Sequence, residues 1–207
     1  MDLQNIRKKS LNSAEKLGYE INTALPLFDD DIKLRPQEEI VGRSLALFAV
    51  VACSYGFDKP SAIQWMAREG VIDYLSDSER SFLNDGEGDI SFFQSQAEGL
   101  NAFAWALGFV KSMPFDSICD NTLIKRFPDI KNDKSSSEYK AQSAARSIAQ
   151  IISACDLAYC LHWAIVNAEV NNQDLHGGVG RHVIIERRRA LEWMLCTDDW
   201  DEIILDT

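Results

Sequence analysis

Apolar residues recur at spacings of three and four along most of the chain, which is the period of an amphipathic helix. The first such run spans residues 2–17 and is followed by Gly18, a residue that ends helices in the left-handed conformation. No alternating strand pattern is longer than 19–27, where Pro26 keeps the chain extended. The pattern therefore predicts an all-α protein, with any sheet limited to a small hairpin in 19–27.

A second helix is expected from Arg35-Pro36 to about Tyr55, because proline suits the first helical turn. Glu38 and Glu39 complement the positive end of its dipole. The segment 45–53 is apolar on every side, which is typical of a helix that is covered all round. This helix is therefore predicted to lie at the centre of the fold.

Further helices are expected over 60–69, 76–83, 90–107, 121–127, 137–168 and 181–195. Ser76 and Glu79 have the spacing of a capping box. The polar stretch 131–137 holds no core residue and is predicted to be a flexible linker. The chain is thus expected to form one domain, 1–207, of about seven to eight helices around a central apolar helix, with 1–34 as an N-terminal helix plus extended segment.

Composition places the chain among globular proteins, since 207 residues with 46% hydrophobic and 26% charged residues are enough to bury one core. The net charge of -11 disfavours binding to nucleic acid or to an anionic membrane. No apolar run reaches the roughly 18 residues of a membrane-spanning helix, and the amino terminus lacks a secretory signal pattern. We therefore expect a cytoplasmic protein.

The five cysteines are odd in number and show no C-x-x-C spacing, so neither a disulfide framework nor a zinc knuckle is indicated. Four of them lie in helical apolar runs. We expect all five thiols to be free and most to be buried; they are Cys53, Cys119, Cys155, Cys160 and Cys196.

Six runs of residues stand out in order along the chain: LRPQEEIVGRSLAL from Leu34, EGLNAFAWALG from Glu98, CD at Cys119, DLAYCLHWA from Asp156, ERRRALEWM from Glu186 and WDEIILDT at the end. Together they resemble a bacterial family of uncharacterised proteins, the domain of unknown function 4272 family. The resemblance implies no established activity. In that family's pattern an arginine often stands at the position of Cys160, and acidic residues at those of Gln150 and Ser153, and these departures weaken any active site placed on this helix.

His162 is the most chemically suggestive residue, because it lies on the inner stripe of the helix 137–168 with Asp156 close to the same face. If the following hairpin closes between residues 168 and 181, His162 lies level with 186–188 at about 1.5 Å per residue. Arg187 or Arg188 must then interrupt an apolar stripe. An inward guanidinium needs a carboxylate or carbonyl partner.

Two interpretations of this cluster follow. In an acid–base site, His162 exchanges a proton, Asp156 or Glu186 orients it, and Arg187 or Arg188 holds an anionic substrate. In the alternative, the same residues form a buried polar network that fixes helix register. Because such networks are common in helical proteins, we favour the structural interpretation.

Metal and cofactor sites are not expected. The histidines at 162, 176 and 182 are not preceded by glutamate at metal-binding spacing, and H-E-x-x-H is absent. The segment 176–181 brings glycines and an arginine to the start of a helix, as a phosphate cradle does, but it has neither the preceding strand nor the G-x-G-x-x-G spacing. A glycine-rich helix connection is favoured there.

Acidic residues gather near the end of the chain at Asp198, Asp199, Asp201 and Glu202, where they could attract a basic protein. The leading hypothesis is a binding or structural module with an acidic surface and a protein partner, rather than an enzyme. One alternative is a small hydrolase or other acid–base enzyme that uses the His162 cluster. Another is an immunity-type protein that binds a basic toxin.

Overall fold

The computed structural model describes residues 1–29, 31–174 and 177–207, and within these ranges the regular structure is helical with no strand. The α-helices are α1 (Leu3–Lys16), α2 (Gln37–Ser54), α3 (Lys59–Glu69), α4 (Asp77–Asn84), α5 (Ile90–Ser95), α6 (Ala97–Ala106), α7 (Ser137–Gln142), α8 (Ile148–Val170) and α9 (Arg181–Leu195). Short 3₁₀ helices are η1 (Ile72–Tyr74), η2 (Leu123–Arg126), η3 (Ile130–Asn132) and η4 (Trp200–Glu202). The all-α prediction is confirmed.

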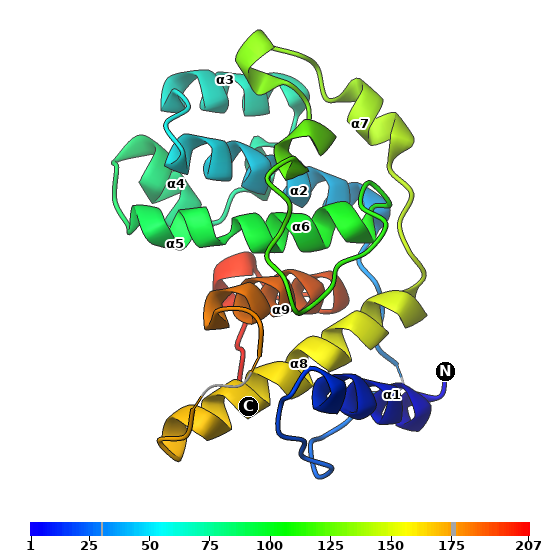
Figure 1. Cartoon of the computed structure of the whole chain (residues 1–207). Helices are drawn as coiled ribbons and strands as arrows, with labels where there is room; N and C mark the ends of the chain where they lie inside the picture. The colour runs from blue at the N-terminus through cyan, green and yellow to red at the C-terminus, as the bar shows by residue number, and fades with distance from the viewer. Residues whose placement is uncertain (30, 175–176) are drawn as a thin grey trace.

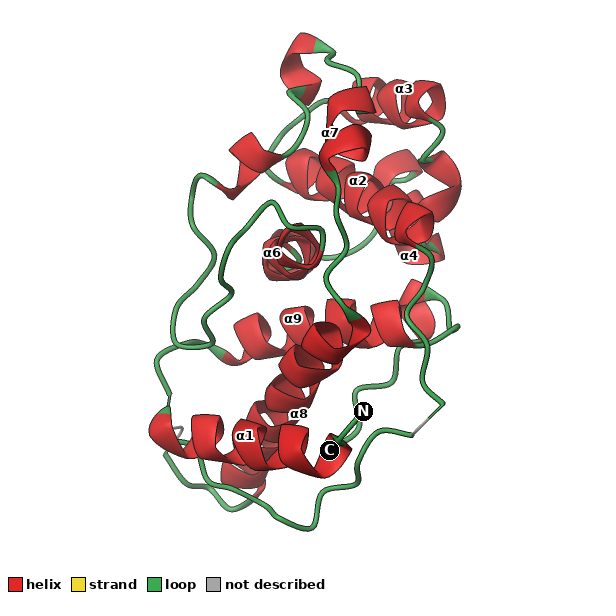
Figure 2. Cartoon of the chain, turned by 90° about the vertical axis from the view of Figure 1, so that its right-hand side faces the viewer, coloured by secondary structure: helices red, strands yellow, loops and turns green. Residues whose placement is uncertain are grey.

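The long helices are stacked in an order that differs from their order in the chain. α3 packs on α2, α2 on α6, α6 on α9, α9 on α8 and α8 on α1, so the stack runs from α3 at one end to α1 at the other (Figure 1). Figure 2 shows α6 nearly end-on, between α2 and α9. The α8–α9 hairpin and the surroundings of α2 therefore lie in different halves of the molecule.

α2 is covered on nearly every side, as its apolar sequence predicts, and its residues 40–51 are all buried. Arg43 is a residue of this helix, and its guanidinium forms an ion pair of 2.6 Å with Glu79, which is fully buried. Glu79 also accepts a hydrogen bond from the backbone N–H of Ser76 and completes the capping box of α4. The predicted capping box is confirmed, and the same carboxylate neutralises a core arginine.

The helix expected over 90–107 is divided by a single residue, Gln96, into α5 and α6. The helix expected over 121–127 is a shorter 3₁₀ turn, η2. A carboxylate oxygen of Asp120 accepts a hydrogen bond from the backbone N–H of Thr122 just before this turn. In both places the sequence predicted a helix correctly but overestimated its regularity.

The prediction of one continuous helix over 137–168 is wrong in its first part. The chain forms two helices there, because α7 ends at Gln142 and α8 begins at Ile148. The chain between them donates hydrogen bonds from the backbone N–H groups of Ala144 and Arg146 to the carbonyls at the end of α6. Those carbonyls have no partner within their own helix, so the tertiary contact satisfies them. Ser147 and Gln150 then form a capping box that opens α8.

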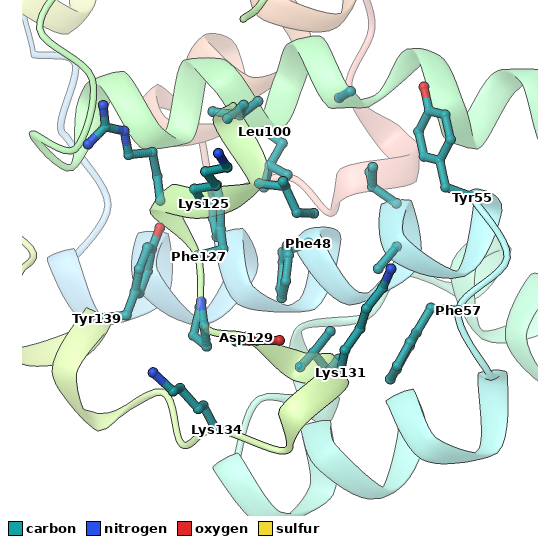
Figure 3. Close-up of a pocket in the computed structure, with 18 of the residues that line it drawn as sticks. Phe48, Tyr55, Phe57, Leu100, Lys125, Phe127, Asp129, Lys131, Lys134 and Tyr139 are labelled. Carbon is teal, nitrogen blue, oxygen red and sulfur yellow. The ribbon is translucent and has the colours of Figure 1, made fainter. Parts of the chain in front are cut away.

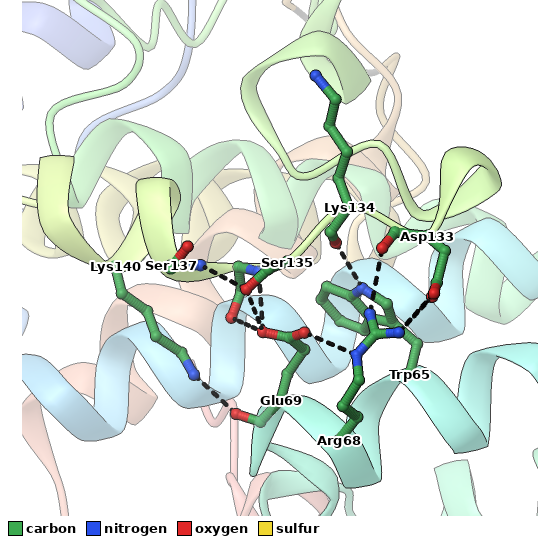
Figure 4. Close-up of polar contacts among 9 residues, drawn as sticks. Trp65, Arg68, Glu69, Asp133, Lys134, Ser135, Ser137 and Lys140 are labelled. Atoms are coloured by element: carbon green, nitrogen blue, oxygen red, sulfur yellow. Dashed lines mark hydrogen bonds and ion pairs between the residues drawn. The ribbon is translucent and has the colours of Figure 1, made fainter.

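The stretch 131–137, expected to be a flexible linker, is held against the C-terminal end of α3 by side-chain contacts (Figure 4). Glu69 accepts hydrogen bonds from the backbone N–H and the hydroxyl of Ser136, and Arg68 pairs with Asp133 at 2.6 Å. Trp65 donates its indole N–H to the carbonyl of Lys134. These partners belong to α3, far away in the sequence.

α8 is the one helix in the described ranges that is long and apolar enough to cross a membrane, and 56% of its most apolar stretch is buried in the fold. A core helix meets the same criterion of length and composition. α8 packs between α1 and α9, in keeping with such a core position.

All five cysteines are free, as predicted, and Cys53, Cys155 and Cys160 are buried. Burial raises the pKa of the Cys53 thiol to about 12 and that of Cys160 to about 11. These thiols are therefore protonated and unreactive at neutral pH.

Candidate functional site

His162 on α8 and Arg188 on α9 meet across the hairpin, as helix arithmetic predicted. Arg188 Nη1 lies 2.7 Å from Nδ1 of His162, and both residues are buried. Because a guanidinium only donates, Nδ1 must accept this hydrogen bond. Burial, and then the positive charges of Arg188 and Arg181, lower the pKa of His162 to about 4. The imidazole is therefore neutral near pH 7, and the lone pair that would take up a proton is occupied.

The other two nitrogens of Arg188 also donate hydrogen bonds within the protein. Its Nε donates to the Glu192 carboxylate over 2.6 Å, and Nη2 donates to the carbonyl oxygen of Asp206 over 2.9 Å. The guanidinium also lies 4.6 Å from the ring centre of Tyr159. With its donors engaged in this way, Arg188 is poorly placed to clamp an anionic substrate.

Asp156 does not join His162 but pairs with Arg7 of α1. The closest oxygen–nitrogen distance is 2.7 Å, and both side chains are buried. Arg7 also donates to the carbonyls of Leu25 and Pro26, which tie the extended segment after α1 to α8. This interaction fastens the N-terminal region to the hairpin and leaves Asp156 without a role in orienting the imidazole.

Arg187 points to the other face of α9 and pairs with Glu98 of α6 at 2.6 Å. It donates as well to the carbonyls of Pro114 and Ser117, so it holds the bend after α6. Glu98 in turn accepts a hydrogen bond from the backbone N–H of Cys119. The need of an inward arginine for a carboxylate partner is thus met by a residue that the sequence analysis did not select.

Glu186 is buried, and its closest cationic partner is Arg189 at a distance of 3.5 Å. Burial raises the pKa of this carboxyl. The five candidate residues therefore enter separate interactions, and among them only His162 and Arg188 are in contact through a hydrogen bond in the described structure. The sequence did hold one signal for a partner of Arg188 that the sequence analysis missed. Glu192 lies four residues after Arg188, a spacing that puts both side chains on the same helix face.

A cavity of about 290 Å³ lies beside Arg188, between the hairpin, the segment after α1 and the C-terminal tail. Its polar lining is supplied by Arg188 and Glu192, which are paired with each other, and by Asp206. Apolar side chains such as Phe28 and Ile204 make up much of the remainder. The cavity is open to solvent, and its central charges are paired with each other rather than arranged for proton transfer.

A larger cleft, of about 1070 Å³, lies in the other half of the molecule, between the C-terminal part of α2 and the segment 119–142. Its floor is a row of stacked rings: Phe48 on Phe127 at 5.0 Å, Phe127 on Tyr139 at 5.2 Å, and Tyr139 on Phe109 at 4.3 Å between ring centres. Figure 3 shows Phe48, Phe127 and Tyr139 with lysines on the segment around them. This volume is slightly larger than the usual range for ligand sites, which is roughly 300–1,000 Å³.

The predicted glycine-rich connection before α9 is described from Gly177 onward, and His176 lies outside the described residues. A side chain at Gly178 would come within 2.7 Å of the carbonyl oxygen of Asp116, so glycine is required there by packing. Arg181 pairs with Glu169 at 2.7 Å. A packing role thus accounts for a glycine of this connection without a bound phosphate.

The acidic residues near the end of the chain lie beside the start of α4. Asp201 accepts hydrogen bonds from the backbone N–H and the hydroxyl of Ser78, over 2.9 and 2.8 Å. Asp77 is thereby brought next to the tail acids, and all are exposed. We call this group, formed by Asp77, Asp198, Asp199, Asp201 and Glu202, the acidic end face.

Comparison with known proteins gave one match. A family model described as "domain of unknown function (DUF4272)" matches residues 7–203, which is nearly the whole chain. No curated protein and no solved structure matches it.

Proposed function

We propose that this chain, which belongs to the DUF4272 family, is a non-catalytic binding module that recognises a cationic protein surface. The observation that supports the non-catalytic part is the contact between Arg188 and Nδ1 of His162. In this contact the charged guanidinium donates a hydrogen bond to Nδ1, whose lone pair is the one that would accept a proton in acid–base chemistry. Asp156 and Arg187, two further candidates for such a site, are held by Arg7 and Glu98.

The acidic end face supports the binding part. Its carboxylates come from two separate chain segments and are gathered by the contact of Asp201 with Ser78. The nearby guanidinium of Arg35 is directed to the backbone carbonyls of Trp193 and Asp198 and to Glu39. The side chains of Asp198, Asp199 and Glu202 are exposed and point their charge at solvent. A surface of this kind attracts cationic partners and accelerates their association.

The test is titration of the protein with a fluorescent peptide of alternating lysine and alanine. The triple variant Asp198→Asn, Asp199→Asn, Glu202→Gln keeps Asp201, which the fold uses. We expect it to weaken binding by about tenfold, since each exposed charge contributes up to about 1 kcal/mol.

The matched control is the triple variant Glu15→Gln, Asp29→Asn, Glu87→Gln, which removes the same charge from exposed sites elsewhere. It should change the dissociation constant by less than about twofold. Equal loss in both triple variants would show that only net charge matters, and the acidic end face would then have no specific role.

A further inference from the structure

The segment 119–142 uses its acidic and basic side chains differently. The carboxylates of Asp120 and Asp129 accept hydrogen bonds from nearby backbone N–H groups, and that of Glu138 accepts one from Gln142. Asp133 pairs with Arg68. The backbone N–H of Thr122 lowers the pKa of Asp120, and the side-chain amide of Asn132 lowers that of Asp129. These carboxylates therefore have fewer lone pairs free for a ligand.

The basic side chains that line the cleft on the same segment have no such partners among the described residues. Lys125, Arg126, Lys131 and Lys134 line the cleft and are exposed, and their side chains form no hydrogen bond or ion pair within the described ranges. Each of the other arginines in the chain has at least one such partner among the described residues; they are Arg7, Arg35, Arg43, Arg68, Arg80, Arg146, Arg181, Arg187, Arg188 and Arg189. The free donor capacity of the cleft wall is therefore cationic.

Large apolar side chains stand on both walls of the cleft. Tyr55, just after α2, is 67% exposed, and Ile124, on η2, is 49% exposed. Phe57 is half-buried on the same wall as Tyr55 (Figure 3). Exposed apolar groups rimmed by charges are typical of an interaction site, because covering them releases water at little cost.

We propose that this cleft binds an extended acidic peptide segment of a partner protein, in which acidic residues alternate with bulky apolar residues. The apolar side chains pack against the exposed Tyr55 and Ile124, above the buried ring floor, and the carboxylates pair with the four cations. In an extended segment, successive side chains point to opposite sides, which matches a cleft with an apolar floor and a charged rim.

The distribution of charge favours a peptide over other anions. An acyl carboxylate has one charge at one end, whereas the four cations are spread over residues 125–134. A nucleic acid or an anionic membrane presents a large uniform negative surface, which the net charge of -11 repels. The lining also carries carboxylates at Asp58, Asp120, Asp129 and Glu138, which balance the four cations in number, and each accepts a hydrogen bond from a neighbouring group of the chain. A short segment can therefore pair with the four unpartnered cations without meeting the negative charge of the whole protein.

The experiment measures binding of a fluorescein-labelled peptide, Glu-Leu-Asp-Phe repeated twice, by fluorescence anisotropy with the full chain. Two further peptides are compared with it: one with lysine in place of each acidic residue, and one with serine in place of each apolar residue. Laurate and a single-stranded DNA oligonucleotide serve as competitors. We expect saturable binding of the first peptide alone, at one peptide per chain.

Two pairs of variants locate the site. Lys125→Glu, Lys131→Glu, Lys134→Glu should weaken binding by about tenfold or more, whereas Lys8→Glu, Lys9→Glu, Lys16→Glu on α1 changes net charge equally and should leave it within about twofold. Tyr55→Ser should weaken it severalfold, and Val170→Ser, an equally exposed apolar site outside the cleft, should not. All these side chains are exposed, so the variants should fold.

Several results would overturn the proposal: no saturable binding of the acidic apolar peptide, equal loss in the α1 variant, or equal binding of the lysine peptide. Tight binding of laurate or of the oligonucleotide without binding of the peptide would assign the cleft to a different occupant. None of these outcomes depends on the acidic end face, so each leaves the proposed recognition of a cationic surface to its own test.

Discussion

In the half of the molecule built on α8 and α9, the side chains of Arg7, Arg187 and Arg188 lie inside the protein, and each meets a carboxylate, an imidazole or backbone carbonyls. Along the cleft near α2, the cations lie in solvent and meet no such partner among the described residues. Both regions attract attention in a search for function, because both combine charged and aromatic residues. The difference teaches that a charged cluster indicates binding or chemistry only if its donors and acceptors are still free.

The physical reason is the cost of burial. A guanidinium taken out of water must recover its hydrogen bonds from the protein, and a buried pair that loses one partner leaves an uncompensated charge. The pairs Arg7–Asp156 and Arg187–Glu98 each join two helices far apart in the sequence, so they specify packing. An exposed lysine has no such cost and remains available to a ligand.

The strongest contrast is expected from Asp156→Ala. Loss of the carboxylate leaves Arg7 buried without its anionic partner and should lower the free energy of unfolding by about 3–5 kcal/mol. Glu169→Ala breaks an exposed pair on the same hairpin and should cost less than about 1 kcal/mol. Urea unfolding of both variants makes the comparison, and equal losses would contradict the structural role of the Arg7–Asp156 pair.

Glu186→Gln sharpens the same comparison, because this buried carboxyl has only a distant cation at 3.5 Å and a raised pKa. The sequence alone gave Glu186 and Asp156 the same role, as the carboxylate that orients His162. The structure instead predicts a small effect, below about 1 kcal/mol at neutral pH, since a neutral amide suits this site about as well as the carboxyl. A loss as large as that of Asp156→Ala in urea unfolding would show a partner that the geometry does not reveal.

An effect between those of Asp156→Ala and Glu186→Gln is expected from the pH dependence that His162 imposes on stability. Its pKa falls from 6.5 to about 4 on folding, so the unfolded chain binds the proton more tightly. The stability from the neutral imidazole is therefore fully present above pH 6.5 and is lost as the pH falls toward 4. Between pH 7 and 5 the free energy of unfolding should fall by about 2 kcal/mol more in the wild-type protein than in His162→Gln. Parallel pH profiles of the two proteins would contradict this origin.

The smallest effect is expected at the cleft. Lys125→Glu, Lys131→Glu and Lys134→Glu should each change the free energy of unfolding by less than about 0.5 kcal/mol, because these side chains hold nothing in place. Thermal unfolding of the single variants checks this. A loss comparable to that of Asp156→Ala would show that the cleft lysines belong to the scaffold and would erase the difference between the two halves.

The amino-acid sequence by itself determined much of the helical structure. The predicted 181–195 helix is α9, and the first two helices end within two residues of their predicted limits. Gly70 ends α3 in the left-handed conformation, and Ser76 with Glu79 opens α4. Local signals of this kind act over a few residues, so periodicity and capping chemistry reveal them.

Only the tertiary structure decided where the chain breaks and which charges meet. The break at 143–147 satisfies carbonyls of α6, and 131–137 is fastened to α3, two contacts between segments that the sequence keeps far apart. The sequence predicted that His162 and Arg188 lie opposite each other, because a single hairpin joins their two helices. The sequence did not predict that Arg7 pairs with Asp156 or Glu98 with Arg187, because Arg7 and Glu98 come from other helices. No local pattern specifies how separate helices stack.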